Sequence, residues 1–357
     1  MSNGPTLSVV MSNFNHARYL PESLGAILAQ SYRPMEIIVI DDGSTDDSVE
    51  VIGRFARKEP RLRLIRNERN QGVLANVNRL LELASGDCLY VAAADDRILP
   101  GFLQRSMEML ARHPQAALCS ASAYMIDAAT NQRIFTLPVE PVSRREAFIP
   151  PAQAMSRFRR HGSWLVGITC INRKEALVKA GGFIPHLGPF CDEFIQMVLT
   201  LKHGACFIPK PLAVWRWSSA GYANSSAAVL EGSLQMWSSA ADLMRTTYAD
   251  LFPRSFVNAW EREKRLHAQL SVVNKAQRQR ISTIQAGRGG PGVTARVLGW
   301  ALRFRMVVFM IYLLVRFPWS MVPLLRRGLK ARLQRFTREG ARDDLAWRPE
   351  GSPVPRP

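Results

Sequence analysis

The chain has 357 residues, 47% of them hydrophobic, and its five cysteines are scattered without any C-x-x-C pair. This composition supports a sizeable core, which excludes a mainly disordered chain, and the cysteine spacing argues against a structural zinc site or a compact disulfide framework. The net charge is +18, but residues 260–357 carry 20 Lys and Arg against 6 Asp and Glu, so the excess of positive charge lies mostly in this last segment and predicts an acidic partner for it.

Apolar runs and helical patterns alternate over the first 60 residues. Residues 7–11, "LSVVM", form an apolar, β-branched run typical of a strand, and residues 17–31 place leucine and isoleucine at helical spacing. A second apolar strand is predicted over 35–41, and the polar turn after it begins a helix over 48–58. The N-terminus has no basic region followed by a long apolar stretch, so we expect no export signal and a body that stays in the cytosol.

Three more elements continue this alternation. Residues 61–67 alternate basic and apolar side chains, as in a strand, and residues 88–94 form another apolar strand. Between them, residues 73–85 have the periodicity of a helix, for which Gly86 is the expected C-cap. Strands and helices joined by short connections are typical of a doubly wound, mostly parallel α/β sheet.

Two pairs of acids follow two of the predicted strands. Asp41 and Asp42 end the second strand, and Asp95 and Asp96 follow the fourth. Because such sheets bind ligands at the carboxyl ends of their strands, we expect both pairs at one edge, close enough to share a ligand. The sequence lacks the Gly-rich phosphate loops of Rossmann dehydrogenases and P-loop enzymes, which disfavours both classes. A divalent cation on Asp95 or Asp96 would instead neutralise the phosphates of a ligand.

A family resemblance rests on four blocks, which read "SVVMSNFNHARYLPESLGAILAQS", "EIIVIDDGSTDDS", "NQGVLANVNRLLELASGD" and "YVAAADDRILPGF". In order and spacing they resemble the nucleotide-binding half of the family 2 glycosyltransferases, which are inverting enzymes with a GT-A fold. The resemblance covers roughly residues 7–218. It implies an α/β fold with a GT-A-type doubly wound mixed sheet flanked by helices, to which this chain adds a C-terminal helical region.

The same resemblance implies a donor site. Asp96 is implied to hold Mg²⁺ or Mn²⁺ on the diphosphate of a nucleotide sugar. The chain departs from the family pattern at Ser12, where a proline is usual, at Phe14, where a tyrosine is usual, and at Ala93, which replaces the first acid of D-x-D-D. The metal would then depend on Asp96 alone, with water completing its shell. The residues implied to contact the donor nucleotide are Ser12, Asn13, Asp42, Gly72, Asn78 and Asp95. Local sequence alone favours a turn or cap role for Asp42, and the order of the four blocks favours the nucleotide contact instead.

The acceptor side resembles the family where the turn Gly181-Gly182-Phe183 precedes an acid that opens a helix. Asp192 is that acid, and the resemblance implies that it is the catalytic base, with Glu193 beside it. A helix N-terminus suits a base but also lowers the pKa of a carboxylate. The alternative role of Asp192 is a helix N-cap only.

Three further residues near the acceptor side have competing interpretations. Trp164 is a candidate for stacking on an acceptor sugar or for the core, and Arg216 for a contact with the diphosphate or for a surface position. Cys191 is predicted to be a buried free cysteine and not a thiol nucleophile, because no motif ties a histidine to it.

The chain beyond residue 218 is divided by composition. We expect a glycosyltransferase domain over 1–218, a helical extension over 219–286, basic amphipathic helices over 291–345 and a disordered tail over 346–357. The apolar run from Met306 to Val315 is too short to span a bilayer, so an interfacial anchor on an anionic membrane surface is favoured over a transmembrane helix. The alternative is a helix that packs on the protein's own core.

The predicted function is transfer of a sugar from a nucleotide-diphosphate sugar to a hydroxyl of a lipid-linked or cell-surface glycan. We expect the protein in the cytoplasm, peripherally associated with the cytosolic face of the membrane, with a glycan or glycolipid acceptor and no nucleic-acid partner. The alternatives are a nucleotidyltransferase of sugar phosphates, or a membrane- or nucleic-acid-binding protein with a degenerate GT-A domain. A nucleotidyltransferase is disfavoured because residues 12–20 lack the Gly-rich basic loop that such enzymes carry.

Overall fold

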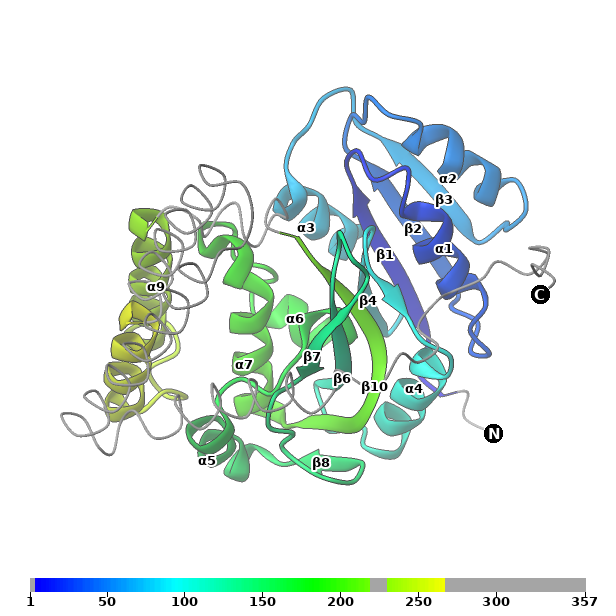
Figure 1. Cartoon of the computed structure of the whole chain (residues 1–357). Coiled ribbons are helices and arrows are strands. Elements are labelled where there is room, and N and C mark those ends of the chain that lie inside the picture. Colours follow the sequence, from blue (N-terminus) through cyan, green and yellow to red (C-terminus); the bar gives the residue numbers. More distant parts are fainter. Residues whose placement is uncertain (1–3, 219–229, 267–357) are drawn as a thin grey trace, which may run out of the picture.

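A computed structural model of the chain describes residues 4–218 and 230–266 (Figure 1). The predicted basic helices over 291–345 and the predicted disordered tail over 346–357 lie outside the described residues, as do 219–229 and 267–286 of the predicted helical extension. Within the described residues, no helix combines the length and the apolar character that crossing a bilayer requires.

A single sheet of ten strands forms the centre of the molecule. Its first half is the predicted alternation of parallel strands and helices. In the chain order of this half, the elements are β1 (Leu7–Asn13), α1 (Leu20–Leu28), β2 (Glu36–Asp41), α2 (Ser48–Ala56), β3 (Leu62–Arg66), α3 (Val73–Leu83) and β4 (Cys88–Ala93).

The second half makes the sheet mixed. The long strands β6 (Leu118–Asp127) and β10 (Ala205–Trp217) are parallel, whereas β9 (Ile171–Arg173) runs antiparallel to both β4 and β6 and joins the two halves. The strand order is β3-β2-β1-β4-β9-β6-β10-β5, with β7 on β6 and β8 on β10. The short strands and the helices of this half are β5 (Arg97–Ile98), α4 (Phe102–Arg112), β7 (Arg133–Leu137), β8 (Ala147–Ile149), α5 (Pro151–His161), η1 (Gly167–Thr169), α6 (Lys174–Lys179), η2 (Pro185–Phe190) and α7 (Cys191–His203).

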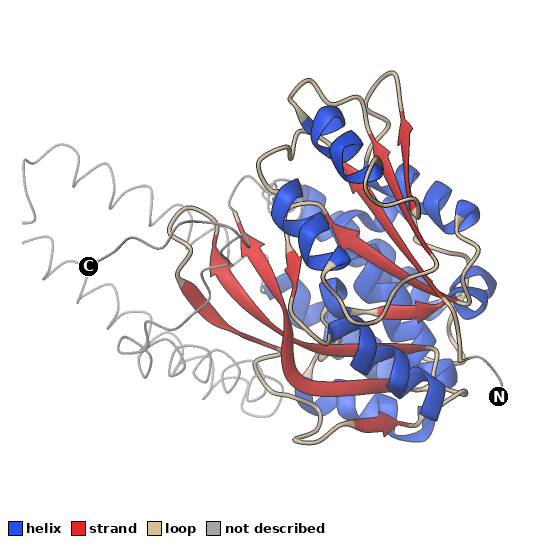
Figure 2. Cartoon of the chain, turned by 90° about the vertical axis from the view of Figure 1, so that its right-hand side faces the viewer, coloured by secondary structure: helices blue, strands red, loops and turns tan. Residues whose placement is uncertain are grey.

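Both faces of the sheet are covered by helices, as Figure 2 shows. Successive strand residues alternate between two apolar cores: Val10 and Ile38 pack on the side of α3, α5 and α7, and Val9 and Ile37 on the side of α1, α2 and α4. The strands read as continuous apolar runs because both of their faces are buried. The expected doubly wound mixed sheet is confirmed.

Gly86 does not have its predicted role. Helix α3 ends at Leu83, and Ala84 is its C-cap in an extended conformation. A Cβ atom at Gly86 would lie 2.7 Å from the backbone nitrogen of Ser8. The glycine therefore allows the chain entering β4 to approach β1, which a local helix-ending pattern does not reveal.

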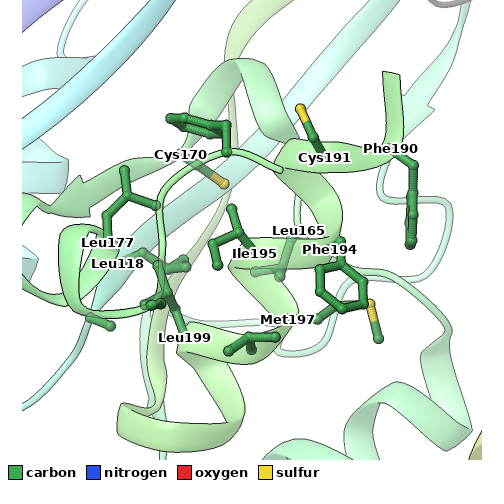
Figure 3. Close-up of a cluster of buried hydrophobic side chains, with 14 of the residues drawn as sticks. Leu118, Leu165, Cys170, Leu177, Phe190, Cys191, Phe194, Ile195, Met197 and Leu199 are labelled. Atoms are coloured by element: carbon green, nitrogen blue, oxygen red, sulfur yellow. The ribbon is translucent and has the colours of Figure 1, made fainter. Parts of the chain in front are cut away.

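The described part of the C-terminal extension is helical and packs on the sheet domain. It comprises α9 (Leu230–Arg245) and a second helix over 254–266. Trp237 and Trp260 place their rings 4.8 and 5.5 Å from the ring of Phe190, the last residue before α7, and the Lys264 ammonium lies 4.8 Å from the Trp237 ring. Figure 3 shows the apolar side chains that α7 presents to this shared core.

Candidate active site

The two acid pairs lie at one edge of the sheet, as predicted. Strand β1 is hydrogen-bonded to β2 on one side and to β4 on the other, and Ser12 is in register with Ile40 and with Ala93. The acids that follow β2 and β4 therefore flank the end of β1. Ser12 is partly exposed between them.

The two acids at the end of β2, Asp41 and Asp42, have different hydrogen-bond partners. Asp41 accepts hydrogen bonds from the Asn13 amide at 2.8 Å and from the Ser44 backbone N–H at 3.0 Å, which fixes the loop after β2. Asn13 is 1% exposed. Its side chain is turned inward to Asp41, and its contact with the donor nucleotide stays a prediction.

Asp42 is buried but surrounded by donors. Its carboxylate accepts the Asn67 amide at 2.8 Å and the backbone N–H groups of Gln71 and Gly72, each at 2.9 Å. Burial by itself would raise the pKa of Asp42, but these hydrogen bonds outweigh it and hold the pKa below its ordinary value. The backbone of the loop at 71–72 therefore binds an ionised carboxylate. The contact of Asp42 with a nucleotide base stays a prediction.

A chain of amides links this acid to Ser12. Asn67 donates to the Asn76 side-chain oxygen at 2.9 Å, and Asn76 donates to the Ser12 hydroxyl at 3.3 Å. The predicted nucleotide ligand Asn78 lies elsewhere: its amide group donates to the Phe183 carbonyl at 2.8 Å and accepts the Phe183 N–H at 3.0 Å. Both ends of the Asn78 amide tie α3 to the turn at Phe183, and its contact with a nucleotide stays a prediction. Helical spacing does not separate the two asparagines, because Asn76 lies four residues before buried Leu80 and Asn78 lies three residues before buried Leu81.

The two acids that follow β4, Asp95 and Asp96, differ in their exposure to solvent. Asp96 is 6% exposed and accepts the Arg216 backbone N–H at 2.7 Å, and burial, together with the neighbouring Asp95 charge, raises the pKa of Asp96 well above its ordinary value. Asp95 is partly exposed. Of the two, Asp95 is therefore the carboxylate that a ligand from solvent reaches first.

Two buried arginines support this acid turn. Arg216 donates to the Asp95 carbonyl at 2.6 Å and pairs with Glu22 of α1, which also pairs with Arg97 at 3.0 Å. Arg216 is therefore not a surface arginine, and its contact with a diphosphate stays a prediction. No local pattern marks Glu22 or Arg97, because Glu22, Arg97 and Arg216 come from segments that only the folded sheet brings together.

The carboxylates at this edge suit a divalent cation that is bound together with a phosphate ligand. No group of three or more His, Cys, Asp or Glu that could hold a metal occurs in residues 4–218 and 230–266. Asp95 offers one partly exposed carboxylate, with Asp96 behind it. Mg²⁺ is commonly held by one or two carboxylates together with water and substrate phosphates, so the donor set fits a cation that arrives with its ligand.

Asp192 lies at the start of α7, as predicted. Its Oδ1 accepts the Glu193 N–H at 2.7 Å. Burial raises the pKa of Asp192 to about 6, and the Glu193 charge adds to this, while the backbone N–H groups act in the opposite direction. The expectation that the helix N-terminus sets a low pKa is wrong here, because burial outweighs the backbone donors.

Two further residues considered for the acceptor side lie in the apolar core. Trp164 is 0% exposed and packs between Phe158 and Phe207, each with its ring centroid 5.8 Å away, so its predicted stacking on an acceptor sugar is wrong. Cys191 is a buried free cysteine, as predicted, and burial raises the pKa of its thiol (Figure 3). A contact between Glu193 and an acceptor stays a prediction.

Part of the sheet domain matches a known family model. Residues 8–178 match the family model described as "Glycosyl transferase family 2". This match includes both acid pairs and ends before α7.

Similar proteins were found in several bacteria. The chain is 36% identical over 114 residues to a putative glycosyltransferase, EpsE, from Bacillus subtilis, which is 32% of this chain and 41% of that protein. It is 33% identical over 137 residues to an uncharacterized glycosyltransferase from Haemophilus influenzae, which is 37% of this chain and 55% of that protein. The match thus spans less than two thirds of the length of either relative.

Solved structures share the fold. TarS 1-349 from S. aureus in complex with UDP-GlcNAc superimposes with a TM-score of 0.57 at 17% identity, over 74% of this chain and 73% of that chain. The mannosyltransferase PcManGT from Pyrobaculum calidifontis, in complex with GDP-Man and Mn²⁺, gives a TM-score of 0.51 at 18% identity, over 94% and 88%. The GT-A-type fold implied by the sequence is thus confirmed.

Proposed function

Since residues 8–178 match the family model described as "Glycosyl transferase family 2", we propose that the protein is an inverting glycosyltransferase that moves a sugar from a nucleotide-diphosphate sugar to a hydroxyl group. The observation that carries this proposal is the placement of Asp42 and Asp95 on either side of Ser12, at one edge of the sheet within the matched segment. An edge of this kind offers an ionised hydrogen-bond acceptor at one end and a partly exposed carboxylate at the other.

The donor would lie along this edge. Asp42 and Ser12 would face the nucleoside, and Asp95 would hold Mg²⁺ or Mn²⁺ against the diphosphate, with Asp96 supporting the turn from behind. When bound, the cation neutralises the charge that develops on the departing nucleoside diphosphate. The geometry favours Asp95 over Asp96 for this role, because Asp96 is buried and already accepts the Arg216 N–H.

Asp192 would act as the base. Its carboxylate accepts the proton of the acceptor hydroxyl, the oxygen forms a bond to the anomeric carbon, and the bond from that carbon to the diphosphate oxygen breaks with its electron pair on the leaving group. Attack on the face opposite the leaving group inverts the configuration at the anomeric carbon. A pKa of about 6 leaves Asp192 ionised at neutral pH, yet makes it a stronger base than an ordinary aspartate.

The acceptor and the place of action are proposed from charge. The excess of Lys and Arg in residues 260–357 fits an anionic membrane surface on the cytosolic side, where a lipid-linked or cell-surface glycan would be the acceptor. Flotation of the full chain with liposomes tests this. Binding should require anionic lipid and weaken with salt, and binding that ignores both would contradict the proposal.

The activity itself is tested with the purified full chain and a panel of nucleotide sugars. We expect one donor to release its nucleoside diphosphate in a reaction that stops in EDTA and resumes with Mg²⁺ or Mn²⁺. Release of pyrophosphate in place of a nucleoside diphosphate would identify a nucleotidyltransferase and contradict the proposal.

A further inference from the structure

Gly167, the first residue of η1, lies directly against the carboxylate of Asp192. A Cβ atom built at Gly167 would meet Asp192 Oδ2 at less than 3.0 Å, a separation that real Cβ atoms essentially never show, and would lie 3.4 Å from Asp192 Cγ. The backbone of Gly167 is outside the left-handed region. Only the carboxylate, and not the backbone conformation, therefore requires a glycine here.

The two oxygens of Asp192 are held in different ways. Oδ1 accepts the Glu193 N–H of its own helix at 2.7 Å, whereas Oδ2 lies over the backbone of Gly167. A side chain at residue 167 would occupy the space of Oδ2 and force the carboxylate to turn. The position of the second oxygen thus depends on a residue 25 positions earlier in the chain.

The short helix η1 is itself fixed to the central sheet. The Thr169 hydroxyl, which is buried, accepts the Ala121 N–H of β6 at 3.0 Å, and the Ser120 hydroxyl accepts the Val166 N–H at 3.1 Å. The Tyr90 hydroxyl of β4 donates to the Ile168 carbonyl at 3.0 Å. Because Asp95 follows β4, the strand that leads to the donor edge also holds the segment on which Asp192 rests.

We propose that Gly167 is a positioning residue for the base. Because Gly167 has no side chain, Asp192 Oδ2 can lie against the backbone of η1, which fixes this oxygen relative to the donor edge. This inference rests on the proposed function, in which Asp192 takes the proton of the acceptor. A catalytic group must be held in place closely, since a misplacement of about 1 Å can cost about 100-fold in rate.

The test is Gly167→Ala in the full chain. We expect kcat for sugar transfer to fall about 100-fold, with the KM for the donor and the dissociation constant of the nucleoside diphosphate unchanged, because the donor edge is untouched. Gly25→Ala is the matched control: no atom lies within 4 Å of a Cβ at Gly25, which is inside α1. This variant should keep the kcat of the unchanged chain.

A double variant separates positioning from general damage to the fold. Asp192→Ala removes the carboxylate that the new methyl group would meet. Gly167→Ala should therefore lower the melting temperature of the unchanged chain. In a chain that already carries Asp192→Ala, the same substitution should lower it much less. An equal loss in both backgrounds would show that residue 167 acts on stability without Asp192 and would overturn the proposal.

The outcomes also separate this inference from the proposed function. If Asp192→Asn abolishes transfer while Gly167→Ala keeps full kcat, Gly167 does not position Asp192 and the inference is overturned. If the unchanged chain transfers no sugar from any donor, the proposed function is wrong. If Asp192→Asn keeps full transfer, the proposed function holds but Asp192 is not the base, and the inference is overturned even where the melting temperatures show that residues 167 and 192 touch.

Discussion

Asp42 is buried and Asp192 is partly exposed, and their surroundings shift their pKa values in opposite directions. At the donor edge, Asp42 accepts three hydrogen bonds, two of them from the backbone of one loop, and its pKa is lowered. On the acceptor side, Asp192 accepts the N–H of Glu193 next to a second acid, and its pKa is raised to about 6. Burial alone therefore does not decide the charge of a carboxylate; the number of donors facing it does.

This difference suits two roles. A carboxylate that stays ionised over a wide pH range is a fixed hydrogen-bond acceptor, as recognition of a donor requires. One that takes up a proton near neutral pH is poised for proton transfer. Four changes would break or sharpen this comparison.

The largest effect is expected from Asp192→Asn, which removes the base but keeps its shape. Transfer should fall by about 10²- to 10⁴-fold, the range that a general base contributes. The affinity for the nucleoside diphosphate, measured by calorimetry, should stay the same. If Asp192→Asn transfers sugar normally and Glu193→Gln does not, the base has been assigned one residue too early.

The next effect concerns the acid turn after β4. Asp95→Asn should lower turnover by about 100-fold, as expected for the loss of an electrostatic stabiliser, and should weaken activation by Mg²⁺ or Mn²⁺. Asp96→Asn should keep that activation, because the buried side chain serves the turn. Metal titrations of activity distinguish the two variants. If only Asp96→Asn abolishes the metal response, the assignment from sequence is right; full activity in EDTA would exclude a metal role for either acid.

A smaller effect is expected from Asp42→Asn. The new amide nitrogen would face the Gly72 N–H, so that two donors meet. Gly72 keeps its bond to Asn70, but the new amide N–H has no acceptor there, which should destabilise the fold by about 1–3 kcal/mol while weakening donor binding. Chemical denaturation measures the first effect and calorimetry the second. Glu175→Gln serves as a control, because the Glu175–Lys179 pair is exposed and exposed ion pairs contribute little to stability. A donor affinity that Asp42→Asn leaves unchanged would contradict the assigned contact.

The smallest effect is on the pH dependence of stability. A carboxyl group whose pKa is raised in the folded state binds its proton more tightly there, so Asp192 should make the fold less stable as pH rises from about 4 to 6. Asp42 has the opposite sign: its contribution is present above its unfolded pKa and is lost as pH falls through its lowered folded pKa. Unfolding free energies of Asp192→Asn against the unchanged chain should diverge over this interval. Parallel curves would contradict the raised pKa.

Much of the donor edge could be predicted from the sequence, because local pattern decides it. Apolar strands ending in Asp41-Asp42 and Asp95-Asp96 required only that parallel strands end at one edge. Likewise, Asp192 was placed at a helix start by the residues around it.

What could not be predicted depends on tertiary contacts. Nothing local separates Asn76, which faces Ser12, from Asn78, which faces Phe183. The burial of Trp164, and the pairing of Glu22 with two arginines, arise where segments far apart in sequence pack together. The direction of the Asp192 pKa shift was missed for the same reason, since burial is a property of the packed fold.

The opposite behaviour of the two carboxylates is measured most directly by a ¹³C NMR titration of their side-chain carboxyl groups in the full chain, each assigned with its Asn variant. Asp192 should titrate with a midpoint near pH 6, while Asp42 should remain ionised until the pH is below the ordinary range for aspartate. Two midpoints that coincide at an ordinary value would contradict both the electrostatic difference and the division of roles between recognition and proton transfer.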